Sequence, residues 1–440
     1  MNYKDTLKIN EKGHLEIGGC DTVDLVKKYS TPLYVMDESY IRNVCRAYTK
    51  TIKKVYGYGD CAYASKAFCC AAIYTVMQEE GMHVDVVSGG EIYTALKAGF
   101  DLKNAHFHGN NKYESELDLA ISNGIGTIVV DNLDEIDMID KICDKYNVKQ
   151  NVLIRSNPGV EAHTHEYIQT TRIDSKFGFS FKNGDCLEAI KKVIASKNLV
   201  FKGLHCHIGS QIFDKNAFAL AVDVMTDYIK KLQVEENIIV DEINLGGGYA
   251  VYYTESDPKY NVEQYCEYVE TIADALQKAV DSKNIKKPYL MIEPGRSIVG
   301  EAGITLYSVG NIKDIKGVKK YLAIDGGMYD NIRPALYDAK YEAILANRAN
   351  DKNEEIVTIA GKCCESGDII IKDIELPKAN RGDIVAVFTT GAYCYSMASN
   401  YNRNVLPPVI FVNNGKSGYA VKPQTYEDLV RNDIIKVEME

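Results

Sequence analysis

Between about residue 60 and residue 295, short apolar runs alternate with longer amphipathic stretches. The apolar runs begin near Cys61, His83, Ala105, Thr127, Gln150, Phe201, Asp241 and Pro288. Between them, apolar side chains recur with a helical period over residues 113–123, 133–146, 185–196, 216–233 and 261–283. This alternation is typical of βαβ units, and eight such units predict a closed (β/α)8 barrel.

After about residue 295 the helical period is lost. Apolar runs separated by Gly, Pro and Asn turns occupy residues 304–309, 321–324, 356–360, 368–374, 384–388 and 409–412. They predict an antiparallel β domain, to which the short N-terminal runs 7–10 and 15–17 add strands. A chain of 440 residues exceeds the size of a single core.

These patterns together predict two domains in an α/β protein. We expect the barrel over residues 35–290, and the β domain from residues 1–34 and 291–440. The long stretch 158–183 separates a barrel strand from its helix and is a candidate lid.

Composition narrows the class of protein. The net charge of −10 argues against nucleic acid as a partner. No apolar stretch approaches the roughly 20 residues of a membrane helix, and Met1–Thr6 lacks the apolar core of a signal peptide. Twelve cysteines in 440 residues are too sparse for a disulfide scaffold. We therefore expect a cytoplasmic enzyme with reduced thiols.

Polar or glycine-rich segments follow every predicted barrel strand, at the end where such barrels carry their chemistry. In chain order they are Lys66, residues 88–91, residues 108–112, Asp131, and residues 155–157, 207–210, 246–248 and 293–296. An amine, an imidazole, a glycine triplet and a Glu–Arg pair thus share one end of the barrel. We expect the active site there.

Lys66 ends the apolar run that begins at Cys61. Apolar surroundings disfavour an ammonium, and a neutral lysine is what Schiff-base chemistry requires. Most lysines in such runs are instead solvated rim residues. Glu293 also ends an apolar run, where its carboxylate could face a pyridine nitrogen and keep the ring protonated. An ion pair with Arg296 is the alternative for Glu293.

Gly246–Gly248 allows backbone N–H groups to approach an anion, because no Cβ stands in the way. Ser210 and the backbone of Gly295 and Arg296 could add donors, so that together they hold one phosphate. The glycine triplet matches neither the Rossmann fingerprint nor a P-loop.

A metal site is the competing interpretation of the histidines. The chain contains three His-x-His pairs, His106/His108, His163/His165 and His205/His207. Residues two apart on a strand face the same side, so each pair could clamp zinc. No bridging ligand is evident, and a lone strand histidine is more often structural. We predict no metal.

The second domain carries its own polar candidates. They are Asp325–Tyr337, which contains Arg333, the thiol and carboxylate of Cys363–Asp368, and the segments Gly391–Tyr393 and Asn400–Asn402. A structural role is possible for each one separately.

Six ordered motifs resemble those of the diaminopimelate decarboxylase family, fold-type III pyridoxal phosphate enzymes related to ornithine and arginine decarboxylases. The motifs are Tyr63–Ala67, His207–Gln211, Gly246–Gly248, Glu293–Arg296, Cys364–Asp368 and Gly391–Tyr393. The resemblance runs from about residue 30 to residue 412, and His108–Lys112 and Asp325–Tyr337 favour the diaminopimelate branch.

The resemblance implies a role for each matching residue. The catalytic residues would be Lys66, which binds pyridoxal phosphate covalently, His207 on the ring face, Glu293 at the pyridine nitrogen, and Cys364 as proton donor. Ser210, Gly248, Gly295, Arg296 and Tyr393 would bind the cofactor, and Arg296, Arg333, Tyr337, Glu365 and Tyr393 the substrate. The family forms head-to-tail homodimers in which Cys364 and Glu365 enter the partner's site.

The implied reaction converts meso-2,6-diaminopimelate to L-lysine and CO2, the last step of lysine biosynthesis. Glu293 argues against racemisation, because racemases of this fold use an arginine there. Thr171 and Cys394 stand where glycine is usual, and Thr171 leaves room for another dibasic substrate. A non-catalytic paralogue would usually lose the lysine or the thiol, and both Lys66 and Cys364 are present.

Overall fold

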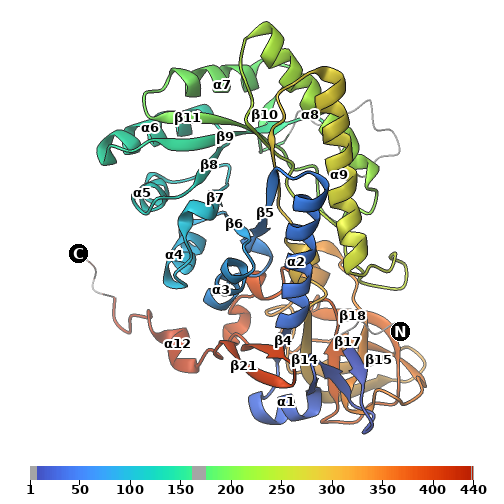
Figure 1. Ribbon diagram of the computed structural model, residues 1–440. Helices are drawn as coiled ribbons and strands as arrows, with labels where there is room; N and C mark the ends of the chain where they lie inside the picture. The colour runs from blue at the N-terminus through green and yellow to red at the C-terminus, as the bar shows by residue number, and fades with distance from the viewer. Residues whose placement is uncertain (1–6, 161–174, 438, 440) are drawn as a thin grey trace. The chain divides into compact units, whose positions relative to one another are not determined.

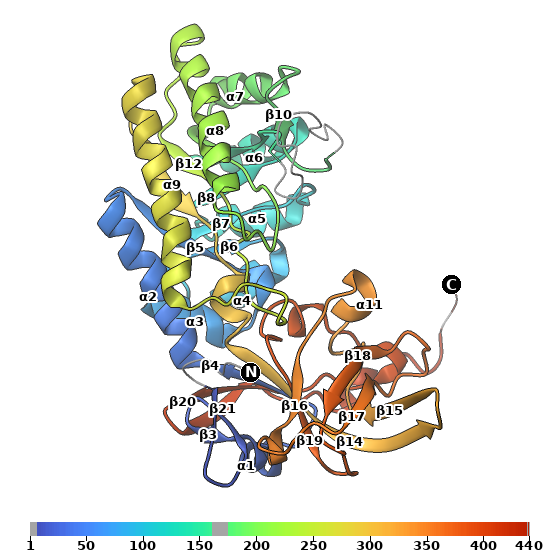
Figure 2. The same cartoon turned by 90° about the vertical axis from the view of Figure 1, so that its right-hand side faces the viewer.

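The computed structural model describes residues 7–160, 175–437 and 439, which belong to two compact units. The first, called the sheet unit here, combines the chain up to residue 41 with residues 252–258 and the chain from residue 299 onward. The second, the barrel unit, comprises residues 42–251 and 259–298. Figures 1 and 2 show the helices and strands of each.

Eight parallel strands close into a barrel in the barrel unit. They are β5 (Gly59–Ala64), β6 (His83–Val86), β7 (Ala105–Phe107), β8 (Thr127–Val130), β9 (Gln150–Asn157), β11 (Leu199–His205), β12 (Glu242–Asn244) and β13 (Tyr289–Ile292). The pairings of β13 with β5 and of β8 with β9 close the ring. The predicted barrel is confirmed. The largest differences in a strand start are two residues: β5 starts at residue 59, where 61 was predicted, and β11 starts at residue 199, where 201 was predicted.

Helices connect these strands and lie outside them (Figure 1). They are α2 (Glu38–Val55), α3 (Ala71–Glu79), α4 (Gly89–Lys97), α5 (Glu114–Ser122), α6 (Leu133–Tyr146), α7 (Asp185–Ala195), α8 (Asn216–Glu235) and α9 (Val262–Lys283). In Figure 2, α8 and α9 run side by side. The short pieces η1 (Ser65–Ala67), η2 (Leu102–Asn104), β10 (Phe179–Ser180) and α10 (Arg296–Val299) complete the described part.

Side-chain caps begin several helices of the barrel unit, and α4 and α6 begin directly after a strand. Ser88, Asn132 and Asn261 accept hydrogen bonds from backbone N–H groups in the first turns of α4, α6 and α9. A cap of this kind ends the strand-to-helix loop at a defined residue. The loops after β6 and β8 are therefore short and fixed at the carboxyl ends of the strands.

The sheet unit contains a nine-stranded sheet. Its strands are β4 (Leu33–Asp37), β14 (Gly303–Ile315), β15 (Lys319–Ile324), β16 (Ala343–Leu345), β17 (Glu355–Ala360), β18 (Ile369–Leu376), β19 (Ile384–Val387), β20 (Val409–Asn413) and β21 (Lys416–Val421). Most pairs are antiparallel, as predicted. The sheet is nevertheless mixed, because β15 pairs with β17 and β4 with β20 in parallel.

The N-terminal segment contributes to this unit in two ways. Strand β4 joins the large sheet, whereas β1 (Leu7–Ile9), β2 (Leu15–Ile17) and β3 (Cys20–Asp21) form a separate three-stranded sheet followed by α1 (Thr22–Tyr29). Leu15, Leu33, Ile304 and Ile410 meet in one buried apolar cluster. This cluster joins the N-terminal segment to the C-terminal strands.

Several short elements of the sheet unit were not predicted. They include β4, β16, β21, η3 (Ala346–Arg348), α11 (Arg333–Tyr337), η4 (Tyr395–Met397), η5 (Tyr401–Arg403) and α12 (Tyr426–Val430), and the longer helix α1 was not predicted either. A segment of three to six residues is too short for a helical period to emerge from the sequence.

Three residues named in the sequence predictions lie outside the residues that the structure describes. His163, His165 and Thr171 belong to residues 161–174, which form the centre of the predicted lid. In the described residues, no helix is both long enough and apolar enough to cross a membrane. No disulfide joins any of the twelve cysteines, all of which are described.

Candidate active site

Lys66 lies in η1, directly after β5, at the carboxyl end of the barrel. The expected apolar enclosure is absent, because the Lys66 side chain is exposed. Its ammonium instead acts electrostatically on Asp85, Glu91 and His207. Charged and polar neighbours, rather than apolar ones, therefore characterise the surroundings of this amine.

The glycine triplet after β12 requires glycine for steric reasons. A Cβ on Gly247 would lie 2.0 Å from the carbonyl oxygen of Glu293, and one on Gly248 would lie 2.2 Å from that of Gly209. Gly248 also has a φ of +109°, a value that side-chain-bearing residues rarely adopt. The loops after β11, β12 and β13 are thus packed backbone against backbone.

Two more predicted anion-binding residues meet in these loops. Arg296 donates a hydrogen bond from Nη2 to Oγ of Ser210, at 3.0 Å. A Cβ on Gly295 would lie 2.9 Å from Cβ of Ala64, the last residue of β5. Gly295 thereby allows the Arg296 loop to pack against the strand end that precedes Lys66. A cation, a hydroxyl and glycine backbone suit a phosphate group.

His207 contacts the glycine triplet, since the backbone N–H of Gly247 donates to its Nδ1 at 3.3 Å. Burial and the nearby Lys66 ammonium lower the pKa of His207. The imidazole is therefore neutral at neutral pH, and this half-buried ring can stack on an aromatic cofactor without repelling a pyridinium.

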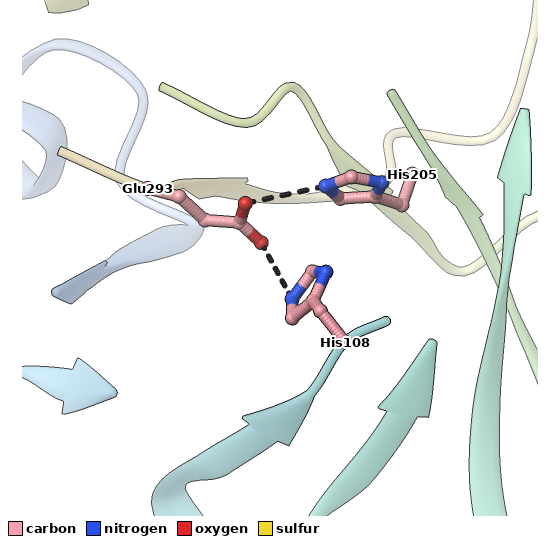
Figure 3. A group of neighbouring side chains, drawn as sticks. All are labelled: His108, His205 and Glu293. Atoms are coloured by element: carbon pink, nitrogen blue, oxygen red, sulfur yellow. Dashed lines mark hydrogen bonds and ion pairs between the residues drawn. The ribbon is translucent and has the colours of Figure 1, made fainter. Parts of the chain in front are cut away.

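Glu293 follows β13 and lies buried in a cluster of polar side chains (Figure 3). Its Oε1 is 3.1 Å from Nε2 of His108 and accepts a hydrogen bond from Nδ2 of Asn244 at 2.6 Å. Its Oε2 lies 3.2 Å from Nε2 of His205. Both imidazoles point toward the carboxylate in Figure 3. The carboxylate group is thus held from three different strand ends.

A second carboxylate completes this cluster. Oδ1 of Asp85, on β6, lies 2.6 Å from the same Nε2 of His108. Although burial opposes it, Asp85 and Glu293 raise the pKa of His108 to about 9. For Glu293, burial alone would raise the pKa, but His108 and His205 hold the pKa of this carboxyl group well below its usual range. At neutral pH an imidazolium therefore lies between two acidic side chains, with Glu293 ionised.

The same cluster is where a metal ion could bind. The donor atoms of His108, His205 and Glu293 all lie within 4.8 Å of one another. They come from two different His-x-His pairs, so neither pair acts as the clamp that the sequence suggested. His207 contacts Gly247 instead, and His106 lies 3.3 Å from Nδ1 of His83. The charge of Glu293 is already compensated by the imidazolium of His108.

In the sheet unit, Arg333 lies beside two other predicted substrate residues, Tyr337 and Tyr393. It is buried at the start of α11, with its Cζ 5.7 Å from the ring centre of Tyr337 and 5.6 Å from that of Tyr393. The ring of Tyr253 lies 5.8 Å away. Nε of Arg333 donates a hydrogen bond to the Tyr341 hydroxyl at 2.9 Å. Three aromatic rings and one hydroxyl therefore surround this cation.

Cys394 fits this cluster without a glycine-like backbone. Its φ is −84°, whereas the preceding Tyr393 has a φ of 63°. The Cys394 thiol is buried, 3.5 Å from the Tyr341 hydroxyl and 3.5 Å from Oδ1 of Asn331. Where the family usually has glycine, the Cys394 thiol thus adds a polar contact with the Tyr341 hydroxyl, the group that accepts the hydrogen bond from Arg333.

Cys364 and Glu365 lie on an exposed turn between β17 and β18. Carboxylate oxygens of Asp368 accept hydrogen bonds from the backbone of Met328 at 2.6 Å and of Cys363 at 2.8 Å. The N–H of Cys364 donates to Asn402 at 2.7 Å. The turn is therefore anchored at its base. The Cys364 thiol is exposed, whereas Oε1 of Glu365 accepts a hydrogen bond from the backbone N–H of Gly367 at 3.2 Å.

Sequence reasoning missed several members of these clusters. They are Asp85, Asn244 and Tyr341, whereas His205 was considered only as half of a possible zinc clamp and Glu91 only as part of the segment 88–91. A usable signal exists for the strand residues: a polar side chain within an apolar run must be buried, and buried polar groups require partners. For Tyr341, no comparable signal is present in the sequence.

Comparisons with known proteins cover the whole chain. A family described as "Pyridoxal-dependent decarboxylase, pyridoxal binding domain" matches residues 41–300. The diaminopimelate decarboxylase of Bacillus methanolicus is 52% identical over 96% of this chain and 97% of its own length, and that of Bacillus subtilis is 48% identical over 99% and 98%. The crystal structure of diaminopimelate decarboxylase from M. jannaschii with L-lysine is 35% identical, with a TM-score of 0.90 over 99% of both chains.

Proposed function

The chain belongs to the pyridoxal-dependent decarboxylase family, in its diaminopimelate decarboxylase branch, and we propose that it converts meso-2,6-diaminopimelate to L-lysine and CO2. This reaction is the last step of lysine biosynthesis by the diaminopimelate pathway. The observation that carries the proposal is the carboxyl end of the barrel. There the ionised Glu293, the glycine triplet and the strand end before Lys66 lie in adjoining loops.

The residues of the barrel unit fit pyridoxal phosphate as the cofactor. Ser210, Gly248, Gly295 and Arg296 hold its phosphate, since they combine glycine backbone with a hydroxyl and a guanidinium. Glu293 would accept a hydrogen bond from the protonated ring nitrogen, and the neutral ring of His207 would cover one ring face. Lys66 supplies the amine that binds the cofactor covalently. When bound, pyridoxal phosphate accepts the electron pair that departing CO2 leaves behind.

The state of Glu293 determines which reaction is favoured. An ionised carboxylate holds a proton on the ring nitrogen, which strengthens the electron sink that decarboxylation needs. Burial alone would neutralise this acid, but the imidazolium of His108 counteracts the effect of burial. Cys364 then donates a proton to the substrate Cα in place of the carboxylate group. Its exposed thiol on the anchored turn is accessible for that step.

Substrate selection rests on the sheet unit. meso-Diaminopimelate carries a carboxylate and an ammonium at its far end as well as at the reacting end. The planar guanidinium of Arg333 suits the far carboxylate, and Glu365 suits the far ammonium. Tyr337, Tyr393 and Arg296 complete the substrate contacts. Ornithine lacks the far carboxylate and would leave the buried Arg333 without an anion.

The proposal extends to assembly, domain limits and location. The protein acts as a homodimer in which Cys364 and Glu365 enter the partner's site, in keeping with their exposure. The predicted catalytic barrel, residues 35–290, extends to residue 298 in this proposal, so that Glu293 and Arg296 belong to it, and residues 1–34 and 299–440 supply the other substrate residues and the interface. The protein is cytoplasmic, which agrees with twelve cysteines and no disulfide among them.

The test is to incubate the purified protein with meso-diaminopimelate and pyridoxal phosphate, and to measure CO2 and lysine. Equal amounts of both products are expected from the wild type and none from Lys66→Ala. Borohydride reduction followed by digestion and mass spectrometry should find the cofactor on the peptide that contains Lys66. The proposal is wrong if the wild type yields no lysine, or if the reduced cofactor is found on another peptide.

A further inference from the structure

We propose that His108, held by Asp85, is a positioning residue that fixes both the orientation and the negative charge of Glu293. Through Glu293 it would set how tightly the site holds the pyridine ring of the cofactor. This inference rests on the proposed function, because it assigns the ring nitrogen to Glu293.

His108 is placed by strand β7, which it follows directly, and by the neighbouring strand β6. His106 and His108 lie on the same side of the β7 line, because Phe107 between them faces the other side. The backbone N–H of His108 donates to the carbonyl oxygen of Val86 at 2.8 Å. The neighbouring strand β6 carries Asp85 in register with His106. The imidazole of His108 is therefore held by its own backbone and by the Asp85 carboxylate at 2.6 Å.

The other two partners of Glu293 are neutral. Oδ1 of Asn244 accepts the backbone N–H of Gly246 at 2.9 Å, so its Nδ2 is the atom that donates to Glu293. Burial lowers the pKa of His205 to about 4, which leaves that imidazole uncharged. His108 is consequently the group in this cluster that brings a positive charge to Glu293.

The groups that act on His108 come from several strands. Asp85 and Glu293 favour its charged form, whereas burial opposes it. His205 and His106 lie close enough to interact with it, and the Lys66 ammonium acts on Asp85. Without a positive charge at position 108, the buried Glu293 would take up a proton. A protonated acid would no longer act as an anionic partner for a protonated ring nitrogen.

The matched variants are His108→Gln and His106→Gln. Both place the same amide on the same face of β7, but His106 contacts His83 rather than Glu293. Cofactor affinity is measured from the absorbance of the bound cofactor, and folding from circular dichroism. We expect His108→Gln to weaken cofactor binding about tenfold to hundredfold, the loss typical of a hydrogen bond to a charged group. His106→Gln should change it by less than about threefold.

A double-mutant cycle separates positioning from general stability. If His108 acts through Glu293, then His108→Gln added to Glu293→Gln should weaken binding by less than about threefold further. A merely structural role would make the two effects multiply, and that result would overturn the inference. So would cofactor binding by His108→Gln that equals the wild type.

Two further outcomes keep the test decisive. If His108→Gln does not fold, Asp85→Asn replaces it. Cofactor affinity is lost as the pH rises and His108 loses its proton, and in Asp85→Asn this loss should begin at a lower pH than in the wild type, because Asp85 helps to keep the proton on His108. An unchanged pH dependence would reject the inference. Failure of the proposed function is distinguishable, because the wild type itself would then bind no cofactor at Lys66.

Discussion

Two buried charges, Glu293 in the barrel unit and Arg333 in the sheet unit, are compensated in different ways. Glu293 has an imidazolium and two neutral donors from its own unit. Arg333 is surrounded by phenol groups and a thiol, and among the described residues no carboxylate forms an ion pair with it. A buried cation without a protein anion is costly. The barrel unit therefore completes its own charge balance, whereas the sheet unit leaves a place for an anion from outside.

The exposed turn of the sheet unit extends this contrast. Lys66 interacts with Asp85, Glu91 and His207, all in the barrel unit. Cys364 and Glu365 project from a turn that is anchored at its base, and Oε1 of Glu365 accepts a hydrogen bond from the backbone N–H of Gly367 at 3.2 Å. The barrel unit thus presents a preformed cofactor site. In our proposal, the groups that the sheet unit presents have the substrate and a second subunit as their partners.

The largest expected effect in the sheet unit is that of Cys364→Ala. Removing a general acid typically lowers a rate about 10²–10⁴-fold, and kcat should fall in that range. Cofactor affinity should stay unchanged, because the thiol lies outside the barrel unit. Steady-state kinetics and the cofactor absorbance measure the two quantities. The matched control is Cys363→Ala, at the buried neighbouring thiol, for which kcat should change by less than about threefold. Normal turnover in Cys364→Ala would remove this thiol from the mechanism.

Arg333→Met is expected to have the second largest effect. It keeps the apolar stem among the tyrosine rings but removes the cation, so kcat/KM for meso-diaminopimelate should fall about hundredfold or more. The ratio of kcat/KM for meso-diaminopimelate over ornithine should fall with it. Tyr341→Phe, which removes only the hydrogen bond to Nε, should cost about tenfold or less. If Arg333→Met leaves the substrate ratio unchanged, the external anion has another binding residue.

A pH effect on stability tests the charge balance of the barrel unit. The folded pKa of His108, about 9, lies above its ordinary value of 6.5. Its stabilising contribution is therefore complete below about pH 6.5 and is lost as the pH rises through about 9. The Tm difference between wild type and His108→Gln should be roughly 5 °C at pH 6.5 and should approach zero at pH 10. Thermal melts across this range measure it, and a Tm difference independent of pH would contradict the assignment.

The smallest expected effect is that of metal removal. Because His108 already compensates Glu293, a chelator should change kcat by less than about twofold. Mass spectrometry of the purified protein should find no stoichiometric zinc. Loss of activity together with stoichiometric zinc would mean that the cluster of His108, His205 and Glu293 is a metal centre instead.

The barrel could be predicted well because its signal is repetitive. Each strand and each long helix buries an apolar face, so the periodicity appears in every βα repeat of the barrel. The predicted starts of the strands are therefore within two residues of the observed ones, as for β5, which starts at residue 59 and was predicted to start at residue 61. The mixed pairing in the sheet unit was harder. The parallel contacts of β4 with β20 and of β15 with β17 join segments far apart in sequence, and no local pattern encodes them.

For the site, the motifs name candidate residues, whose roles stay predictions, but they do not predict the charges of these residues. Lys66 was expected in apolar surroundings, but it is exposed beside acidic side chains. Glu293 was expected to face Arg296 or a ring nitrogen, and its pairing with His108 and His205 was not foreseen. Both depend on side chains from other strands, whose register the sequence alone does not specify.

The His–Phe–His order of residues 106–108, at the end of β7 and directly after it, makes this segment unusually intolerant of length changes. Side chains alternate along a strand, so inserting or deleting one residue before His106 would turn Phe107 toward the barrel interior and both imidazoles toward the helices. Glu293 would then lose its cation although every residue type was still present. Homologues of this branch should therefore differ in length within their surface loops, while the spacing from the start of β7 at Ala105 to His108 stays constant.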